Sequence, residues 1–265
     1  MPAQPAQQIR NDPLVGRLLS DGVARPLPAD IDWRDGVNFL QSCGGARGAW
    51  GCADTFGVPL KNISDSPDSV TFDTFVAYHQ AECDGANQSD AAEAAAITAY
   101  TRLRSAIWAT ELHTSQVGNP DLVGSATDLT PGGGPVGLCE SLIGLIDAQV
   151  QCGVVDVLLH APLHAMPALL RDSLVVFTGT RYLVGGVPIS FDLYPNLGPT
   201  GNPHDPPAAN EAWLYATGPV EYASDAAESF VDAVWRQNKR TISVEQHGIL
   251  RFDPCCVNAV LATIC

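Results

Sequence analysis

Proline interrupts the beginning of this sequence so often that no long helix can form there. Five prolines fall within residues 1–36: Pro2, Pro5, Pro13, Pro26 and Pro28. Proline lacks a backbone N–H and clashes with the preceding turn of a helix, and the apolar residues around these positions are scattered. We therefore predict that residues 1–36 form an extended arm, which would become ordered only against a neighbouring molecule.

The next segment, residues 37–76, has the pattern of a long β-hairpin. One limb centres on Val37, Phe39 and Leu40, and apolar and polar side chains alternate in the returning limb, residues 70–78. Glycine is too frequent between the limbs for regular strand pairing, with Gly44, Gly45, Gly48, Gly51 and Gly57 close together. The pattern predicts a projecting loop that has little of its own to pack against.

A long helix is predicted after this loop. Asp90 and Glu93 have the spacing of a capping box, and alanine-rich sequence continues to Thr110. Four residues are expected on the buried face, with Trp108 and Leu112 beside them: Ile97, Tyr100, Leu103 and Ile107. A second helix is expected from Pro135 to Gly153, with a buried stripe through Leu138, Leu142, Leu145 or Ile146, and Gln149 or Val150. The remainder of the chain reads mainly as short strands, including residues 154–159, 174–177, 187–191, 213–217, 241–250 and 257–264.

Charge and composition exclude several classes of protein. The 265 residues carry a net charge of −15, which argues against a dedicated nucleic-acid binder and against adhesion to anionic lipid. Only 16% of the residues are charged and 46% are apolar, so we expect other subunits to cover much of the surface, although a compact secreted protein could share this composition. No apolar run reaches the ~20 residues of a membrane helix, and residues 1–13 lack the apolar core of a secretion signal, so we expect synthesis in a cytoplasm.

Signatures of catalysis or metal binding are weak. His160 and His164 stand four residues apart, but Pro162 lies between them and Ala161 occupies the place of the glutamate in a zinc-protease motif. Neither Cys43 with Cys52 nor the adjacent Cys255 and Cys256 has zinc-finger spacing, and a disulfide within the loop or between chains is the more plausible use of these cysteines. We predict no cofactor. A cytosolic hydrolase or metalloenzyme using His160, His164 and a cysteine stays open as an alternative.

The order of elements resembles that of the major capsid proteins of tailed bacteriophages, whose Hong Kong ninety-seven fold is also used by encapsulins. Four segments resemble successive elements of that fold: CGVVDVLLHAPLHAMPALLRD, LVVFTGTRYLVGGVPISFD, AWLYATGPVEY and RQNKRTISVEQHGILRFDPCCVNAVLATI. The resemblance implies an α+β fold with an N-terminal arm at residues 1–36 and an extended β-hairpin, the E-loop, at 37–76. It further implies a peripheral domain at 77–134 and 241–265, with a spine helix at 88–114, and an axial α/β domain at 135–240.

By this resemblance the chain would be a structural protein without enzymatic activity. Hexamers and pentamers would assemble into an icosahedral shell around double-stranded DNA, with a separate scaffolding protein and a portal as partners. The chain would be made in the host cytoplasm and reside in the virion. An encapsulin-like nanocompartment shell is the nearest alternative, and a head-completion or tail-tube protein is another.

Six residues are the candidates for contacts between subunits: Trp33, Cys43, Trp50, Cys52, Phe56 and Lys61. All except Trp33 lie in the predicted E-loop. Some members of the family form a lysine–asparagine cross-link, which needs a lysine in this loop, an asparagine on a neighbour and a catalytic glutamate. Lys61 has the first position, but the sequence does not identify the other two.

Overall fold

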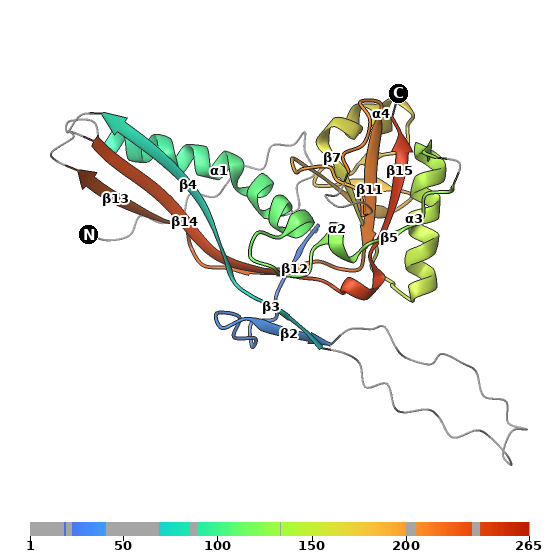
Figure 1. The fold of residues 1–265 in the computed structure, drawn as a ribbon, viewed down its shortest axis with the longest axis horizontal. Helices are drawn as coiled ribbons and strands as arrows, with labels where there is room; N and C mark the ends of the chain where they lie inside the picture. Colours follow the sequence, from blue (N-terminus) through green and yellow to red (C-terminus); the bar gives the residue numbers. More distant parts are fainter. Residues whose placement is uncertain are drawn as a thin grey trace, which may run out of the picture.

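The chain forms two lobes and a projecting hairpin in a computed structural model (Figure 1). The structure describes residues 19, 23–40, 69–84, 89–132, 134–199, 205–234 and 239–264. One lobe is built on a long five-stranded sheet and helix α1, and the other on an eight-stranded sheet with helices α3 and α4. Of two hydrophobic cores, one fills the elongated lobe and extends to Leu158, Tyr215 and Ala259 of the eight-stranded sheet, and the other lies within the second lobe.

The sheet of the elongated lobe is organised around its longest strand, β14 (Lys239–Arg251). Along one edge of β14 lies β4 (Phe75–Asp84), and along the other lie β13 (Glu228–Val234) and β12 (Glu221–Ser224) in succession, all antiparallel to it. The two-residue strand β1 (Arg25–Pro26) continues the sheet beyond β12 in parallel. Alternate residues of β14 are buried, including Ile242 and Val244, so one face of the sheet is covered.

Helix α1 (Ser89–Thr114) provides this cover, which confirms the predicted long helix. The Tyr100 hydroxyl donates a hydrogen bond to Gln246 of β14, at 2.8 Å, and the Trp108 ring meets Phe75 of β4 edge-on. The predicted buried face is confirmed only in part. Tyr100, Trp108 and Leu112 are buried, whereas Ile97 and Leu103 are each 44% exposed. Ala96 and Ser105 are buried in addition, because both lobes contact α1 and its buried positions follow two surfaces rather than one apolar stripe.

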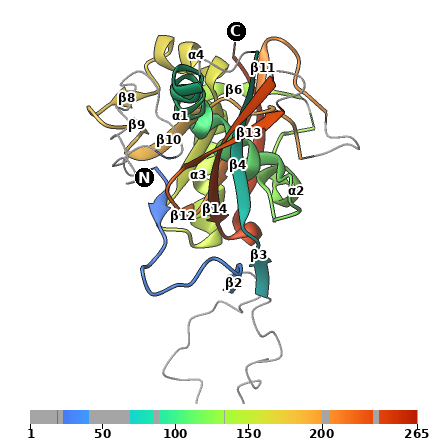
Figure 2. The same cartoon turned by 90° about the vertical axis from the view of Figure 1, so that its left-hand side faces the viewer.

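Strands of the second lobe run in the order β5-β15-β11-β7-β10-β9-β8, and β6 also pairs with β15. Their bounds are β5 (Thr127–Asp128), β6 (Val136–Gly137), β7 (Leu158–Pro162), β8 (Val176–Phe177), β9 (Tyr182–Val184), β10 (Val187–Asp192), β11 (Glu211–Thr217) and β15 (Asn258–Thr263). Helix α3 (Leu138–Cys152) packs across β11 and β15, and the short helices are α2 (Leu122–Ser125), η1 (Leu163–Ala165), α4 (Met166–Arg171) and η3 (Pro254–Cys256). Figure 2 shows β8, β9 and β10 together on one side of this lobe.

The predicted stripe of α3 is confirmed. Leu138, Leu142, Leu145 and Gln149 are buried, whereas Val150 is exposed, so Leu145 and Gln149 hold the positions that the sequence left open. The helix starts at Leu138 rather than at Pro135, because Val136 and Gly137 pair with β15. Gly153 ends it in the left-handed conformation, with φ of 81°, as its position after the last turn predicts.

The two sheets do not divide the chain at residues 240 and 241, where the sequence predicts a domain boundary. Strands β12 and β13 belong to the elongated sheet, and β15 pairs with β11 in the other sheet. The chain therefore crosses between lobes after β11 and again after β14. Strand patterning marks where strands occur, but it does not show which sheet each one joins.

Residues 23–36, which the sequence assigns to the arm, pack on their own chain. Val23, Ala24 and Leu27 are buried in the core of the elongated lobe. The backbone N–H groups of Arg25 and Leu27 donate hydrogen bonds to backbone carbonyl oxygens at strand β12. This part of the arm therefore needs no neighbour to become ordered. Residues 1–18 and 20–22 lie outside the described residues.

The predicted hairpin is present at its base. Strand β2 (Val37–Leu40) pairs with β3 (Ser69–Phe72) in antiparallel register, from Val37 opposite Phe72 to Leu40 opposite Ser69. Phe72 anchors it through an edge-on contact with Phe252, with ring centroids 5.6 Å apart. The returning limb is shorter than predicted, because β4 begins at Phe75 and joins the elongated sheet. Residues 41–68 lie outside the described residues.

Candidate functional site

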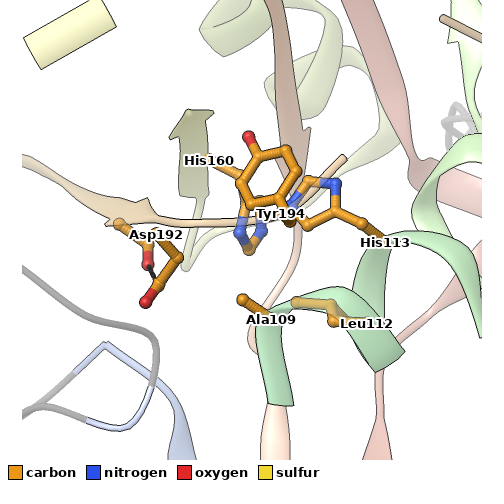
Figure 3. Close-up of a pocket in the computed structure, with 7 residues that line it drawn as sticks. Ala109, Leu112, His113, His160, Asp192 and Tyr194 are labelled. Atoms are coloured by element: carbon orange, nitrogen blue, oxygen red, sulfur yellow. Dashed lines mark hydrogen bonds between the residues drawn. The ribbon is translucent and has the colours of Figure 1, made fainter. Parts of the chain in front are cut away.

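A cluster of buried rings lies where the two lobes meet. His113, near the end of α1, stacks on Tyr194 with ring centroids 3.4 Å apart, and its ring meets His160 of β7 edge-on at 5.8 Å (Figure 3). The ring of Tyr215 in β11 packs edge-on against another side of His113, with ring centroids 5.3 Å apart. Each lobe thus contributes rings to the same contact.

Hydrogen bonds fix the polar groups around these rings. The Thr217 hydroxyl donates to the carbonyl of Gly218, so its oxygen accepts from His160 Nε2 at 3.0 Å. Asp192 accepts from Ser105 of α1 at 2.8 Å and from Ser190 at 2.7 Å, which adds a second link between the lobes. Within the described part of the chain, His113 Nδ1 and the Tyr194 hydroxyl have no hydrogen-bond partner.

Burial keeps these rings uncharged at neutral pH. It lowers the pKa of His160 to about 3, and burial together with the neighbouring His160 lowers the pKa of His113 well below its ordinary value. Burial raises the pKa of Tyr194 well above its ordinary value. The space among the side chains leaves no room for a water molecule. This cluster is therefore a packed joint between lobes, and it offers no access to a substrate.

The structure separates the two histidines of the enzyme hypothesis. His160 is 2% exposed and lies within the joint, whereas His164 lies on the surface at η1. No group of three potential metal-binding side chains occurs among the residues that the structure describes. Cys139 is an exposed thiol on α3, and Cys255 is disulfide-bonded. The described residues therefore do not bring His160, His164 and a cysteine together, as the enzyme hypothesis requires.

Of the six predicted contact residues, only Trp33 falls within the described part. Its ring is half-buried against the core of the elongated lobe, with the Arg34 guanidinium 5.7 Å from the ring centroid. Cys43, Trp50, Cys52, Phe56 and Lys61 lie outside the described residues. A role for all six in contacts between subunits stays a prediction.

One candidate interaction surface is the face of the elongated sheet that α1 leaves uncovered. Val76 and Tyr78 of β4 and Phe230 of β13 are exposed. A groove of about 340 Å³ opens on this face, lined by Arg34, Asp225, Ala226, Glu228, Phe230, Glu245 and His247. Glu228 and Glu245 lie directly opposite each other in the strand register, and Arg34 forms an ion pair with Asp225. The groove is consequently acidic as well as apolar.

Further apolar side chains are exposed on the other lobe. Ile143 and Val150 lie on the outer face of α3, and Val176 and Phe177 form the edge strand β8. Sequence analysis did not predict the exposure of these residues, and it gave Val150 as an alternative to Gln149 on the buried stripe. The sequence indicates one of these positions, because Ile143 is an apolar residue outside the predicted buried stripe of its helix.

Solved structures provide the comparison that decides the fold. No protein-family model and no curated protein matches this sequence. A structure described as the capsid of an empty GTA particle computed with C5 symmetry aligns over 99% of this chain and 94% of its own, with a TM-score of 0.58 and 10% identity. The fold of this chain is the phage capsid fold.

Structures from two phages agree with this result. A chain of Mycobacterium phage Ogopogo covers 94% of this chain and 93% of its own, with a TM-score of 0.57 and 9% identity. A chain of Gordonia phage Cozz gives a TM-score of 0.52 at 12% identity over 89% of this chain. The capsid fold thus accounts for nearly the whole chain, including both lobes. No helix in the described ranges has the length and apolar character needed to cross a membrane.

Proposed function

We propose that this chain is the major capsid protein of a tailed bacteriophage. Copies would self-assemble as hexamers and pentamers into an icosahedral head that encloses double-stranded DNA, in the virion. The observation that carries the proposal is the alignment of 99% of this chain with a capsid chain from a particle computed with C5 symmetry. The low fraction of charged residues and the exposed apolar side chains on both lobes support it, because shell subunits bury much of their surface against one another.

In this proposal the elements have the roles that the resemblance implies. Helix α1 would be the spine helix, residues 37–76 the E-loop and residues 1–36 the N-terminal arm, of which residues 23–36 pack on the elongated lobe. The elongated lobe would be the peripheral domain and the lobe with the eight-stranded sheet the axial domain, which replaces the predicted boundaries. The joint at His113 and His160 would hold the two domains at a fixed angle. A scaffolding protein and a portal would come from separate chains.

The packaged DNA would be enclosed rather than bound in a specific site. With a net charge of −15, the chain has no excess of cations to neutralise phosphates, so DNA could slide past the shell wall during packaging. A shell without catalytic activity also fits the water-free histidine joint.

Electron microscopy tests the proposal directly. The chain should form closed icosahedral shells, or rings of five and six, when it is expressed with the head proteins encoded beside it. Soluble monomers under these conditions would contradict the proposal. An encapsulin-like nanocompartment is the second candidate, since it would share the fold, and nucleic acid rather than protein cargo inside particles made during infection would decide for the phage head.

A further inference from the structure

The projecting hairpin changes direction where it joins the elongated lobe (Figure 1). Strand β3 ends at Phe72 and β4 begins at Phe75, so residues 73 and 74 form the bend between the hairpin and the sheet. The other limb enters β2 through Gly36, whose φ of 87° lies in the left-handed region. A Cβ atom at Gly36 would lie 3.1 Å from the carbonyl oxygen of Phe72. Both limbs of the hairpin therefore turn at the same level, in close contact.

Asn119 holds this bend through a reciprocal pair of hydrogen bonds. Its side-chain oxygen accepts from the backbone N–H of Asp73 at 2.6 Å, and its side-chain nitrogen donates to the carbonyl oxygen of Asp73 at 2.9 Å. The contact between the rings of Phe72 and Phe252 also holds the base of the hairpin, but apolar contacts are not directional. Hydrogen bonds require alignment of donor and acceptor, so the pair at Asn119 fixes the orientation of the backbone at the bend.

Asn119 is itself anchored to the end of α1. Its backbone N–H donates to the hydroxyl oxygen of Ser115 at 2.9 Å, and the Ser115 hydroxyl donates to the Glu111 carboxylate at 2.7 Å. The other oxygen of this carboxylate accepts from the backbone N–H of Gln116 at 2.9 Å. Glu111 is only 7% exposed, so water competes little for these bonds. A continuous chain of hydrogen bonds thus connects α1 with the bend of the hairpin.

The same end of α1 takes part in the joint between the lobes. His113 lies two residues after Glu111, and its ring packs against Tyr194 and Tyr215 of the second lobe. We infer that Asn119 is a positioning residue, which sets the direction of the hairpin and ties it to the end of α1 at this joint. The inference rests on the proposed function, in which the hairpin has to reach a neighbouring copy at a fixed angle.

Asn196 supplies a matched control in the same chain. Its side chain accepts from the backbone N–H of Trp213 and donates to the Trp213 carbonyl oxygen, both at 2.9 Å. Asn119 and Asn196 are both half-buried. Replacement of either residue by alanine removes the same two kinds of hydrogen bond, so both variants should show similar decreases in melting temperature. Only the replacement of Asn119 should change the direction of the hairpin.

A distance between two spin labels tests the inference on the full, unassembled chain. Nitroxides are attached to p-acetylphenylalanine at Ser69, the first residue of β3, and at Arg102, an exposed position of α1. The chain with no further change should give one narrow distance distribution by double electron–electron resonance. Asn119→Ala should at least double its width, and Asn196→Ala should leave it unchanged. Ser115→Ala removes only the anchor of Asn119 on α1, so it should give an intermediate width.

Several results would overturn the inference, once circular dichroism has identified the variants that fold. An unchanged width in Asn119→Ala, or the same broadening in Asn196→Ala, would show that Asn119 does not set the direction of the hairpin. An unchanged width in Ser115→Ala would contradict the tie to α1. If Asn119→Ala does not fold, Ser115→Ala alone gives the answer, because a broader distribution supports the inference and an unchanged one overturns it.

Shell formation separates this inference from the proposed function. Expressed with the other head proteins, Asn119→Ala should give at least tenfold fewer closed shells than Asn196→Ala, counted by electron microscopy. Equal numbers would contradict a role of Asn119 in positioning the hairpin for assembly and leave the capsid proposal standing. Absence of particles from the unmodified chain would contradict the capsid proposal, whereas broadening confined to Asn119→Ala and Ser115→Ala would still support the control of the hairpin by Asn119.

Discussion

At the scale of single residues, the joint between the lobes depends on histidines that are buried without charge. His160 uses Nε2 to donate to Thr217, and His113 is enclosed by the rings of Tyr194, Tyr215 and His160. A protonated imidazole in either position would be desolvated, and neither ring forms an ion pair with a carboxylate of the described residues. Protonation must therefore oppose the native packing of this joint.

The stability of the protein should fall as the pH drops below 6.5. The pKa of His160 is about 3 in the folded chain and near 6.5 in the unfolded chain, so the unfolded state binds the extra proton between these values. The contribution of His160 is fully present above pH 6.5, and about 2 kcal/mol of it should be lost by pH 4.5. Urea unfolding of the full chain at both pH values measures this loss.

The variants His160→Gln and His164→Gln isolate this effect from the titration of carboxylates. His160→Gln should reduce the difference in unfolding free energy between the two pH values by about 2 kcal/mol. His164 is exposed, so His164→Gln should retain the pH dependence of the unmodified chain. An unchanged pH dependence in His160→Gln would show that His160 is not the responsible group.

Gly248 is a second residue on which the packing depends. A Cβ atom at this position would overlap the ring of Trp108 and would lie 3.2 Å from the carbonyl oxygen of Ala223. Trp108 is fully buried and cannot move away, so Gly248→Ala should destabilise the fold by about 1–3 kcal/mol. Gly218→Ala, whose Cβ would meet Val154 at an ordinary 3.5 Å, should cost less. Equal melting temperatures for the two variants would contradict this view of the α1 contact.

At the scale of elements, Gln149 fastens α3 to the rest of its lobe. Its side-chain amide donates to the carbonyl oxygens of Ala216 in β11 and Cys256 in η3, both at 2.7 Å. The residue is fully buried, so neither carbonyl can turn to water instead. One side chain thus connects a helix, a strand and the turn that precedes β15.

Replacement of this amide should destabilise the protein. Gln149→Leu leaves two buried carbonyl oxygens without a donor, which we expect to lower the free energy of unfolding by about 2–4 kcal/mol. Gln151→Leu changes an exposed residue on the same helix and should have little effect. Chemical denaturation of both variants measures the difference, and a cost for Gln149→Leu no larger than that of its control would contradict the fastening role.

At the scale of the whole molecule, the β2–β3 hairpin extends away from both lobes (Figure 1). Its described contacts with the lobes are at its base, where Phe72 meets Phe252 and the Arg251 guanidinium lies 5.6 Å from the Phe39 ring centroid. Arg251 is also held by Glu221, at 2.6 Å, so the base of the hairpin is joined firmly to the elongated sheet.

Replacement of residues 41–68 by a short glycine-containing turn should separate folding from assembly. The change keeps the described pairing of β2 with β3, from Val37 opposite Phe72 to Leu40 opposite Ser69, so it should leave the free energy of unfolding of the lobes within about 0.5 kcal/mol of the unmodified value. Shell formation, followed by electron microscopy, should be lost if this segment binds a neighbouring copy. Normal shells from the shortened chain would refute that role.

The sequence by itself determined the elements whose signals are local. The alanine-rich segment of α1, the apolar stripe of α3 and the terminating Gly153 depend on contacts within a few residues, so both long helices were predicted. Helix α1 begins at Ser89, so Asp90 lies in its first turn and not at the predicted cap position. The resemblance of the element order to phage capsid proteins was likewise sufficient for the fold class.

Only the tertiary structure decided which surfaces meet. The position of β15 in the eight-stranded sheet, the packing of residues 23–36 on their own lobe and the joint between His113 and His160 all depend on residues far apart in the chain. The same holds for the exposed faces of α3 and β8, since an apolar pattern shows that a side chain avoids water but not whether its partner is in the same copy. Strand pairing and burial are long-range free energies, and no local pattern contains them.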